Sequence, residues 1–105
     1  MENLTFKLRN GAKVTIAKEY YDELLSIGIA DFTRWKTNRG IVIVRHNHMD
    51  IPVARLICYT QPGWKIQYFD KNPLNLIPGN LITQFDGRSK HDYRLLVTGT
   101  PWYEW

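Results

Sequence analysis

The stretch of sequence that decides the fold is LTFKLRNGAKVTIAK, which covers residues 4–18. Apolar and polar residues alternate over 4–9 and again over 13–18, as they do along a strand with one buried face. Between the two runs, Asn10-Gly11 supplies the two positive-φ positions that a tight hairpin turn requires. The stretch therefore predicts a β-hairpin within residues 1–18.

After the hairpin, short helices and short strands follow one another. We expect a helix over 19–27 that ends at Gly28, and then two strands over 32–36 and 40–45 joined by a turn at 37–40. A second helix is expected over 51–57, capped by Asp50, with Gln61-Pro62-Gly63 ending the helical region. A strand over 65–69 and a loop over 70–79 follow, and residues 93–98 are either a strand or a helix end. This order of elements predicts an α+β fold.

The length and composition set limits on the class of protein. The 105 residues are enough for a single domain with one core, covering 1–105, and too few for two. The single cysteine, Cys58, excludes an internal disulfide framework and a CxxC metal site. Apolar runs are as short as Ile41–Val44, so we expect no membrane-spanning helix. The first residues lack a signal-peptide pattern, and we expect a cytoplasmic protein.

The net charge of +4 comes from 14 basic and 10 acidic residues. Residues 1–40 and residues 41–105 each carry seven basic and five acidic groups, so the sequence has no basic tail or run. A basic excess favours a polyanionic partner such as nucleic acid, although this one is small and evenly spread along the chain.

Two histidines, His46 and His48, stand two residues apart at the end of a predicted strand. At that spacing two side chains on a strand share a face and can bind one metal ion, with Asp50 or His91 as a further ligand. The alternative is an exposed polar turn, because a His-x-His pair alone is a weak signal. We expect no metal ion and no other cofactor.

A longer set of short motifs lies in the second half of the chain. It comprises ARLI at 54–57, Pro62-Gly63, IQYFDKNPLN at 66–75 and PGNL at 78–81, preceded by a tyrosine-rich acidic helix at 20–25, Trp35 and a strand that ends at Arg45. In order and spacing this set resembles the HNH (ββα-metal) endonucleases of phages and mobile introns, over about residues 14–90. The resemblance implies a strand-strand-helix unit over 65–95. The residues that follow, 96–105, form an aromatic-rich tail.

In that family a metal ion sits on the scissile phosphate and a histidine activates water. The resemblance places the first metal ligand on Gln67, the general base on Tyr68, the central asparagine on Asn80 and the last ligand near Ser89. Only Asn80 keeps the residue type of the family. Gln67 is a weak metal ligand, and a tyrosine with its usual pKa near ~10 is a poor base at neutral pH. The sequence therefore resembles a catalytically degenerate member of the family. The alternative is that the match is a coincidence and that this segment is a β-turn-β unit with an asparagine-rich loop.

A degenerate nuclease scaffold leads us to expect a non-catalytic module that binds double-stranded DNA, encoded by a phage or mobile element and active in the host cell cytoplasm. The family binds phosphates with arginine, lysine and asparagine side chains. The candidate contacts in this chain are Arg39, Arg45, Arg55, Lys65, Lys71, Asn72, Arg88, Lys90 and Arg94.

Two alternatives stay open, and the oligomeric state is not predicted. One is a small phage protein that inhibits a host defence protein or nuclease, in the manner of anti-CRISPR or anti-restriction proteins. Its contacts would be Trp102, Tyr103 and Trp105, unless this tail packs on the protein's own core. The other is a residual metal-dependent endonuclease that uses His46, His48 or His91.

Overall fold

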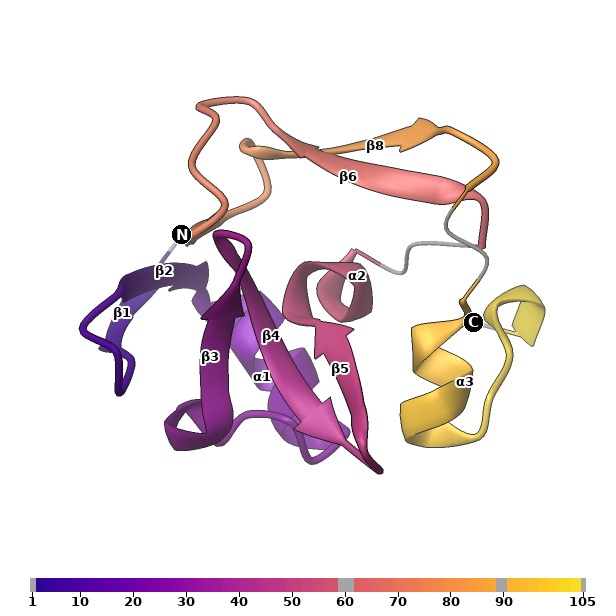
Figure 1. Ribbon diagram of the computed structural model, residues 1–105, viewed down its shortest axis with the longest axis horizontal. Coiled ribbons are helices and arrows are strands. Elements are labelled where there is room, and N and C mark those ends of the chain that lie inside the picture. The colour runs from indigo at the N-terminus through magenta and orange to yellow at the C-terminus, as the bar shows by residue number, and fades with distance from the viewer. Residues whose placement is uncertain (1, 59–61, 89–90, 105) are drawn as a thin grey trace.

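The computed structural model describes residues 2–58, 62–88 and 91–104, and Trp102 through its backbone alone. Gln61, Ser89, Lys90, Trp105 and the side chain of Trp102, all of which the sequence singles out, lie outside the described residues. The described chain is α+β, as predicted. It contains three small sheets and three short α-helices (Figure 1).

The first sheet begins with the predicted hairpin, formed by β1 (Asn3–Lys7) and β2 (Lys13–Ala17). The predicted two-residue turn is wrong, because only Gly11 has a positive φ, of 88°. Leu8 and Ala12 extend the ladder, and Gly11 N–H donates to the Leu8 carbonyl. The Asn10 side chain accepts from Ala12 N–H at 3.0 Å. This pattern is a three-residue loop with glycine in the left-handed position.

The third strand of the first sheet is β7 (Asn75–Leu76), which pairs in parallel with β2. The segment 70–79 was predicted as a loop without a strand, and that prediction is wrong at these two residues. Leu76 is fully buried in the main core. A two-residue strand paired with a partner 60 residues away (Thr15 with Asn75) has no local sequence signal.

The helix predicted at 19–27 is confirmed as α1 (Lys18–Ser26). Its Leu24 is fully buried, and the Leu24 carbonyl accepts a hydrogen bond from Ile29 N–H just beyond the helix. α1 lies behind the strands in Figure 1 and closes that side of the core.

The second sheet contains β3 (Trp35–Asn38), β4 (Ile41–His46) and β5 (Met49–Pro52) in that order. The predicted strand pair is confirmed. However, Phe32–Arg34 form a 3-10 turn because the Asp31 carboxylate accepts from Thr33 N–H, so the first strand begins only at Trp35.

The helix predicted over 51–57 is present over 53–57, but its predicted start and its predicted cap at Asp50 are wrong. Asn47 and His48 both have positive φ and make a tight turn, so the chain returns as β5, with Arg45 opposite Asp50. Helix α2 (Val53–Ile57) then begins after Pro52, and all five of its residues are buried. The sequence did not reveal β5 because its pairing depends on two non-glycine residues in the left-handed region, which is uncommon.

The main core is formed by the first two sheets, α1 and α2. Among the described residues, every buried apolar side chain except Leu76 lies between Leu8 and Ile57. Trp35 is the largest of them, and its indole N–H donates to the Ile29 carbonyl at 2.9 Å. The satisfied indole allows a bulky polar-tipped residue to lie at the centre.

The C-terminal part of the chain contains an antiparallel hairpin of β6 (Trp64–Tyr68) and β8 (Leu81–Phe85), then α3 (Tyr93–Thr98) and a 3-10 turn, η2 (Trp102–Glu104). Residues 93–98 are thus helical. The strand-strand-helix order occurs here, and α3 packs against α2. No helix in the described part of the chain combines the length and apolar character that a membrane crossing requires.

Candidate functional site

Asn80 holds together the loop between β6 and β8. It is only 4% exposed. Its side-chain oxygen accepts from Asp70 N–H at 2.8 Å, and its amide donates to the Asn75 carbonyl at 2.8 Å and to the Asn72 carbonyl at 3.4 Å. These contacts use both ends of the amide inside the loop. Asn80 therefore fixes the loop backbone.

Asp70 is a second polar residue held by this loop. Its carboxylate accepts from the Asn75 side chain at 3.0 Å and from Asn72 N–H at 2.7 Å. The hydrogen bond from Asn75, followed by that from Asn72, lowers the pKa of Asp70 below its usual value. The loop is therefore held by a network of internal hydrogen bonds that involves Asn72, Asn75 and Asn80.

Gln67 and Tyr68 lie next to each other on β6 and consequently point to opposite faces of the hairpin. Gln67 is exposed, whereas Tyr68 is half-buried against the core. Burial raises the pKa of the Tyr68 phenol above its ordinary value, so the phenol stays neutral at physiological pH. The two side chains therefore point away from each other, and an amide is a weak metal ligand while a neutral phenol is a poor base. Ser89, the remaining candidate ligand, is outside the described residues.

The three histidines lie in different places. His46 is the last residue of β4, and His48 is in the following turn with a φ of 66°, so the two do not share the face of one strand. His91 precedes α3, with its ring 5.5 Å from that of Tyr93. Within residues 2–58, 62–88 and 91–104, no group of three or more metal-binding side chains comes together.

Exposed cations gather on the first two sheets. We define the basic surface by seven exposed residues of these sheets and their connecting turns: Lys7, Arg9, Lys13, Arg34, Lys36, Arg39 and Arg45. The acidic residues in the same segments, 3–17 and 31–50, are Asp31 and Asp50, so these segments carry a charge of +5. The rest of the chain sums to −1, since the total is +4. The folded chain has a charge asymmetry that the linear sequence hides.

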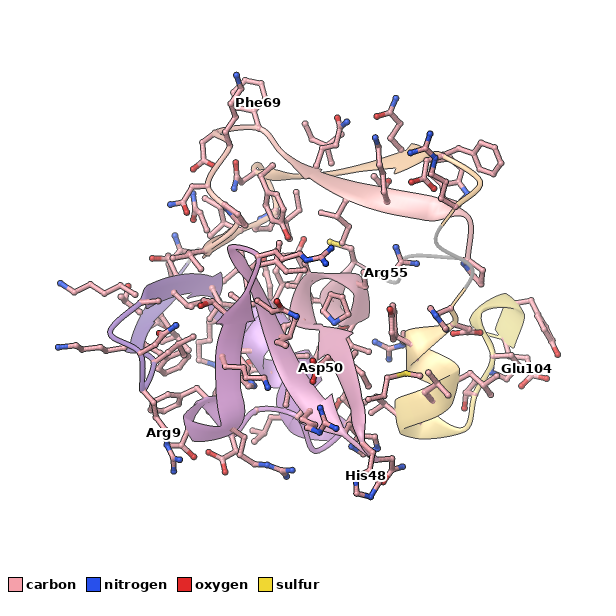
Figure 2. All side chains as sticks on the ribbon, in the orientation of Figure 1. Arg9, His48, Asp50, Arg55, Phe69 and Glu104 are labelled. Atoms are coloured by element: carbon pink, nitrogen blue, oxygen red, sulfur yellow. The ribbon has the colours of Figure 1, made fainter. Side chains whose placement is uncertain are left out.

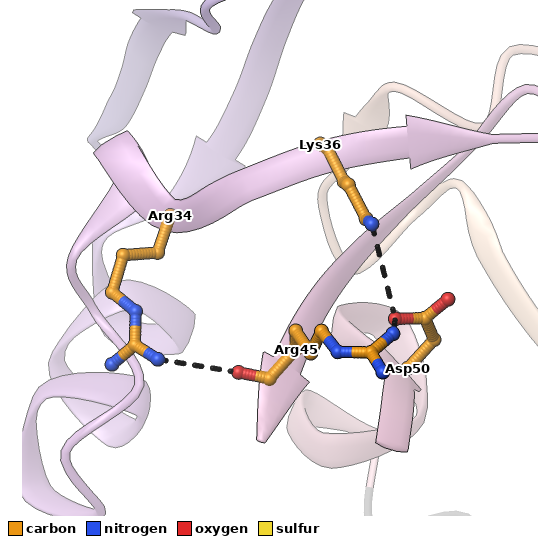
Figure 3. Close-up of polar contacts among 4 residues, drawn as sticks. All are labelled: Arg34, Lys36, Arg45 and Asp50. Atoms are coloured by element: carbon orange, nitrogen blue, oxygen red, sulfur yellow. Dashed lines mark hydrogen bonds and ion pairs between the residues drawn. The ribbon is translucent and has the colours of Figure 1, made fainter. Parts of the chain in front are cut away.

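A hydrogen bond connects the two sheets that carry these cations. The Asn10 side chain at the hairpin turn donates to the Thr37 hydroxyl on β3 at 2.6 Å. Arg9 interacts electrostatically with Asp31, which caps the 3-10 turn before β3 (Figure 2). The guanidinium of Arg34 reaches the Arg45 carbonyl at 3.5 Å, which joins the start of β3 to β4 (Figure 3). The turn of the first sheet thus abuts the strands of the second.

Asp50 neutralises part of this surface. Its carboxylate lies 3.2 Å from the Arg45 guanidinium and 4.0 Å from the Lys36 ammonium (Figure 3). On the first sheet, by contrast, one pair of cations faces each other. Lys7 and Lys13 stand directly opposite in the β1–β2 ladder, an arrangement of like charges that destabilises a hairpin unless an anion lies between them.

The predicted DNA contacts are spread over several parts of the molecule. Arg39 and Arg45 belong to the basic surface, whereas Lys71, Asn72 and Arg88 are exposed on the loops around the β6–β8 hairpin. Lys65 is half-buried on β6. Lys90 lies outside the described residues.

The other two predicted contacts, Arg55 and Arg94, are engaged within the protein. Arg55 is 7% exposed; its guanidinium donates to the Trp64 carbonyl and lies 5.4 Å from the centre of the Tyr93 ring. Arg94 donates to the Leu56 carbonyl at 2.9 Å and lies 3.9 Å from the Glu23 carboxylate. Both arginines therefore attach the C-terminal elements to α1 and α2.

Five residues of the basic surface were not predicted from the sequence: Lys7, Arg9, Lys13, Arg34 and Lys36. The alternation of the hairpin contains a signal for two of them, because it places Lys7 and Lys13 on the outward face of β1 and β2. The others are brought into the surface by the packing of one sheet beside the other, which the sequence does not encode locally.

A small cleft lies between the second sheet, α2, β6 and α3. It has a volume of about 210 Å³, and its walls include Ile41, Pro52, Arg55, Tyr68 and Tyr93. This volume is below the ~300 Å³ at which pockets for small organic ligands begin. We therefore assign the cleft no ligand.

The aromatic tail is only partly described. Tyr103 in η2 is exposed, whereas the side chain of Trp102 and all of Trp105 lie outside the described residues. Comparison of the chain with models of protein families, with curated proteins and with solved structures finds no match.

Proposed function

We propose that the chain is a non-catalytic module that binds double-stranded DNA through the basic surface. The observation that supports this most directly is the charge of +5 on the two N-terminal sheets, all of whose cations are exposed. Duplex DNA presents about one phosphate charge per ~1.7 Å, so a continuous cationic face gains counterion-release energy along its length.

Duplex DNA suits this surface better than a single strand. Proteins that bind single strands stack bases on exposed aromatic rings along a basic groove. Among the described residues, the large exposed apolar side chains lie outside the first two sheets. Contacts to phosphates without base stacking are therefore the mode of binding that the surface offers.

The proposed absence of catalysis rests on Gln67 and Tyr68, whose side chains supply neither a strong metal ligand nor a base at neutral pH. The resemblance of 65–95 to HNH endonucleases adds support for DNA as the partner. With it, we propose a phage or mobile-element protein that acts on DNA in the host cytoplasm.

The first prediction tests the basic surface by charge reversal. In the triple variant Lys7→Glu, Lys13→Glu, Arg39→Glu, we expect the affinity for a short duplex to fall at least about 10-fold at ~50 mM salt. The slope of log affinity against log salt should shrink by up to ~2.7, which is ~0.9 for each lost phosphate contact. Fluorescence anisotropy of a labelled duplex across a salt series measures both quantities.

The matched control is the double variant Lys71→Glu, Arg88→Glu, which reverses exposed charges beside the β6–β8 hairpin. We expect it to bind nearly as tightly as the original chain. Loss of affinity in the control but not in the triple variant would move the DNA site to the hairpin. An original chain that does not bind duplex at low salt would overturn the proposed function.

A second candidate function is binding to a host protein, and Phe69 favours it. This side chain is 77% exposed and points away from the body of the molecule (Figure 2). Its backbone N–H donates to the Asn80 carbonyl at 2.8 Å, so a rigid loop presents the ring. A preorganised aromatic side chain is typical of an interface hot spot.

The second prediction concerns this candidate. If Phe69 anchors a host protein, Phe69→Ser should abolish co-purification of that protein from nuclease-treated host lysate without lowering the melting temperature of the chain. The exposed Leu25 on α1 provides the control, Leu25→Ser, which should retain the partner. Equal recovery with the Phe69 variant and the original chain would contradict the assignment.

A further inference from the structure

One edge of the β6–β8 hairpin is open. Asp86 N–H donates to the Gly63 carbonyl at 2.9 Å, and Phe69 N–H donates to the Asn80 carbonyl at 2.8 Å. Hydrogen-bonded pairs alternate along an antiparallel ladder, so Ile82 and Gln84 direct their backbone groups toward β6. The backbone N–H and C=O groups of Leu81, Thr83 and Phe85 consequently point away from β6.

The corresponding edge of β6 is occupied by the protein itself. The Trp64 carbonyl accepts from the Arg55 guanidinium, and the Tyr68 carbonyl accepts from Lys71 N–H at 2.9 Å. Figure 1 shows β6 on the side of α2 and β8 as the outermost strand. Among the described residues, the outward groups of β8 have no strand partner, because the sheet contains β6 and β8 alone.

β8 itself carries none of the side chains that protect an edge strand. Its sequence, LITQF, has no charge, no proline and no glycine. Folded proteins protect a free edge with lysine, proline or a bulge, because an exposed uncharged edge pairs with another strand. Phe85 is 65% exposed and Ile82 is also exposed, so β8 presents apolar side chains as well as unpaired backbone groups to solvent.

We propose that a second copy of this chain covers β8, through antiparallel pairing about a two-fold axis at Thr83. In this register Thr83 faces Thr83 of the second copy, and Leu81 faces Phe85 of the second copy. The match is self-complementary, because the central residue meets itself and an aliphatic side chain meets an aromatic one at both ends. The two hairpins become one four-stranded sheet.

The charge distribution favours a second copy over a charged partner. Residues 62–105 carry five basic and four acidic groups, a net charge of +1. The +5 of the basic surface belongs to the other part of the molecule. Two copies therefore meet through their nearly neutral parts with little repulsion. This inference does not rest on DNA binding.

The test replaces Thr83, the residue on the proposed two-fold axis. In Thr83→Lys and in Thr83→Glu, two like charges face each other across the axis, and each variant alone should be a monomer. A one-to-one mixture of the two variants should dimerise, because the introduced ammonium of one copy then faces the introduced carboxylate of the other. Sedimentation velocity over a concentration series measures the mass, which doubles for the original chain and for the mixture.

The control is Thr5→Lys, which introduces the same charge at an exposed threonine on β1, an edge strand of the first sheet. It should dimerise like the original chain, and circular dichroism should show that all the variants are folded. An original chain that stays monomeric up to millimolar concentration overturns the proposal. So does a dimer that persists in Thr83→Lys, or a mixture that stays monomeric.

Discussion

Asn80 shows how a residue that is recognisable in the sequence can have a local structural role. The resemblance to HNH endonucleases gives it the task of orienting a catalytic histidine. In the structure its amide spans the loop instead, from Asp70 N–H on one side to the Asn75 carbonyl on the other. The role that the structure shows for Asn80 is therefore to hold the loop backbone.

The third prediction follows from this network. Replacing the buried amide in Asn80→Ala leaves the Asp70 N–H and the Asn75 carbonyl without their partner. We expect the free energy of unfolding to fall by about 2–3 kcal/mol. Urea unfolding followed by tryptophan fluorescence measures the change. The control is Asn38→Ala on the exposed end of β3, which should cost less than ~0.5 kcal/mol. Equal stability of the two variants would contradict the role given to Asn80.

The elements differ in how far the sequence predicts them. The β1–β2 hairpin, α1 and the β3–β4 pair have local signals, namely alternation, helical spacing and a glycine-containing turn. By contrast, β5 and β7 exist because of the strands they pair with. β5 is placed by the turn at Asn47 and His48, and β7 by its contact with β2. Single-chain periodicity cannot show pairing partners of this kind.

The candidate site follows the same rule. The sequence identified exposed cations such as Arg39 and Arg45, but it also included Arg55, whose guanidinium binds the Trp64 carbonyl inside the protein. Lys7 and Lys13 were not included, although the alternation of the hairpin places both on its outward face; the sequence does not show that the second sheet packs beside them. Residue type predicts that a side chain can bind phosphate, and only the packing shows which of these side chains share a face.

The fourth prediction concerns the β3–β4 turn. Gly40 has a φ of 83° with open space around the position of a Cβ atom, so the only cost of Gly40→Ala is that of the backbone. We expect a loss of about 1 kcal/mol in stability. Gly79→Ala is the matched control, since Gly79 also has open space but no left-handed φ. Thermal unfolding should show no destabilisation in Gly79→Ala. A Gly40→Ala variant as stable as Gly79→Ala would contradict the cost assigned to the left-handed backbone.

At the scale of the whole molecule, charge and apolar surface are separated. The exposed cations gather on the first two sheets, whereas most large exposed apolar side chains of the described chain lie between Trp64 and Tyr103. The same division appears in the core, to which the C-terminal part contributes Leu76 as its one fully buried apolar residue among those described. One part of the chain is a well-packed basic body, and the other is attached to it by few buried groups.

The fifth prediction tests this attachment. Truncation of a fully buried leucine costs about 2–5 kcal/mol, so Leu76→Ala should weaken the joint between β7 and β2. In native-state hydrogen exchange, the amides of Ile82 and Gln84 should open at a lower free energy than that of Val44 in the central strand β4. The difference between the opening free energies of these two groups of amides should be larger in Leu76→Ala than in the original chain.

The control for that experiment is Leu25→Ala on the exposed face of α1, which should leave both groups of amides unchanged. If the amides of Ile82 and Val44 exchange with the same free energy in the original chain, the molecule unfolds as one unit and the proposed division is incorrect.

The pairing of β7 with β2 also has a consequence for biosynthesis. Asn75 is 60 residues from Thr15, so this contact closes the longest loop in the first sheet and carries a loop-closure entropy that nearby pairs avoid. A nascent chain that has emerged as far as α2 already holds every other buried apolar residue of the described core. Leu76 is the last of them to leave the ribosome, and the first sheet is completed only after its arrival.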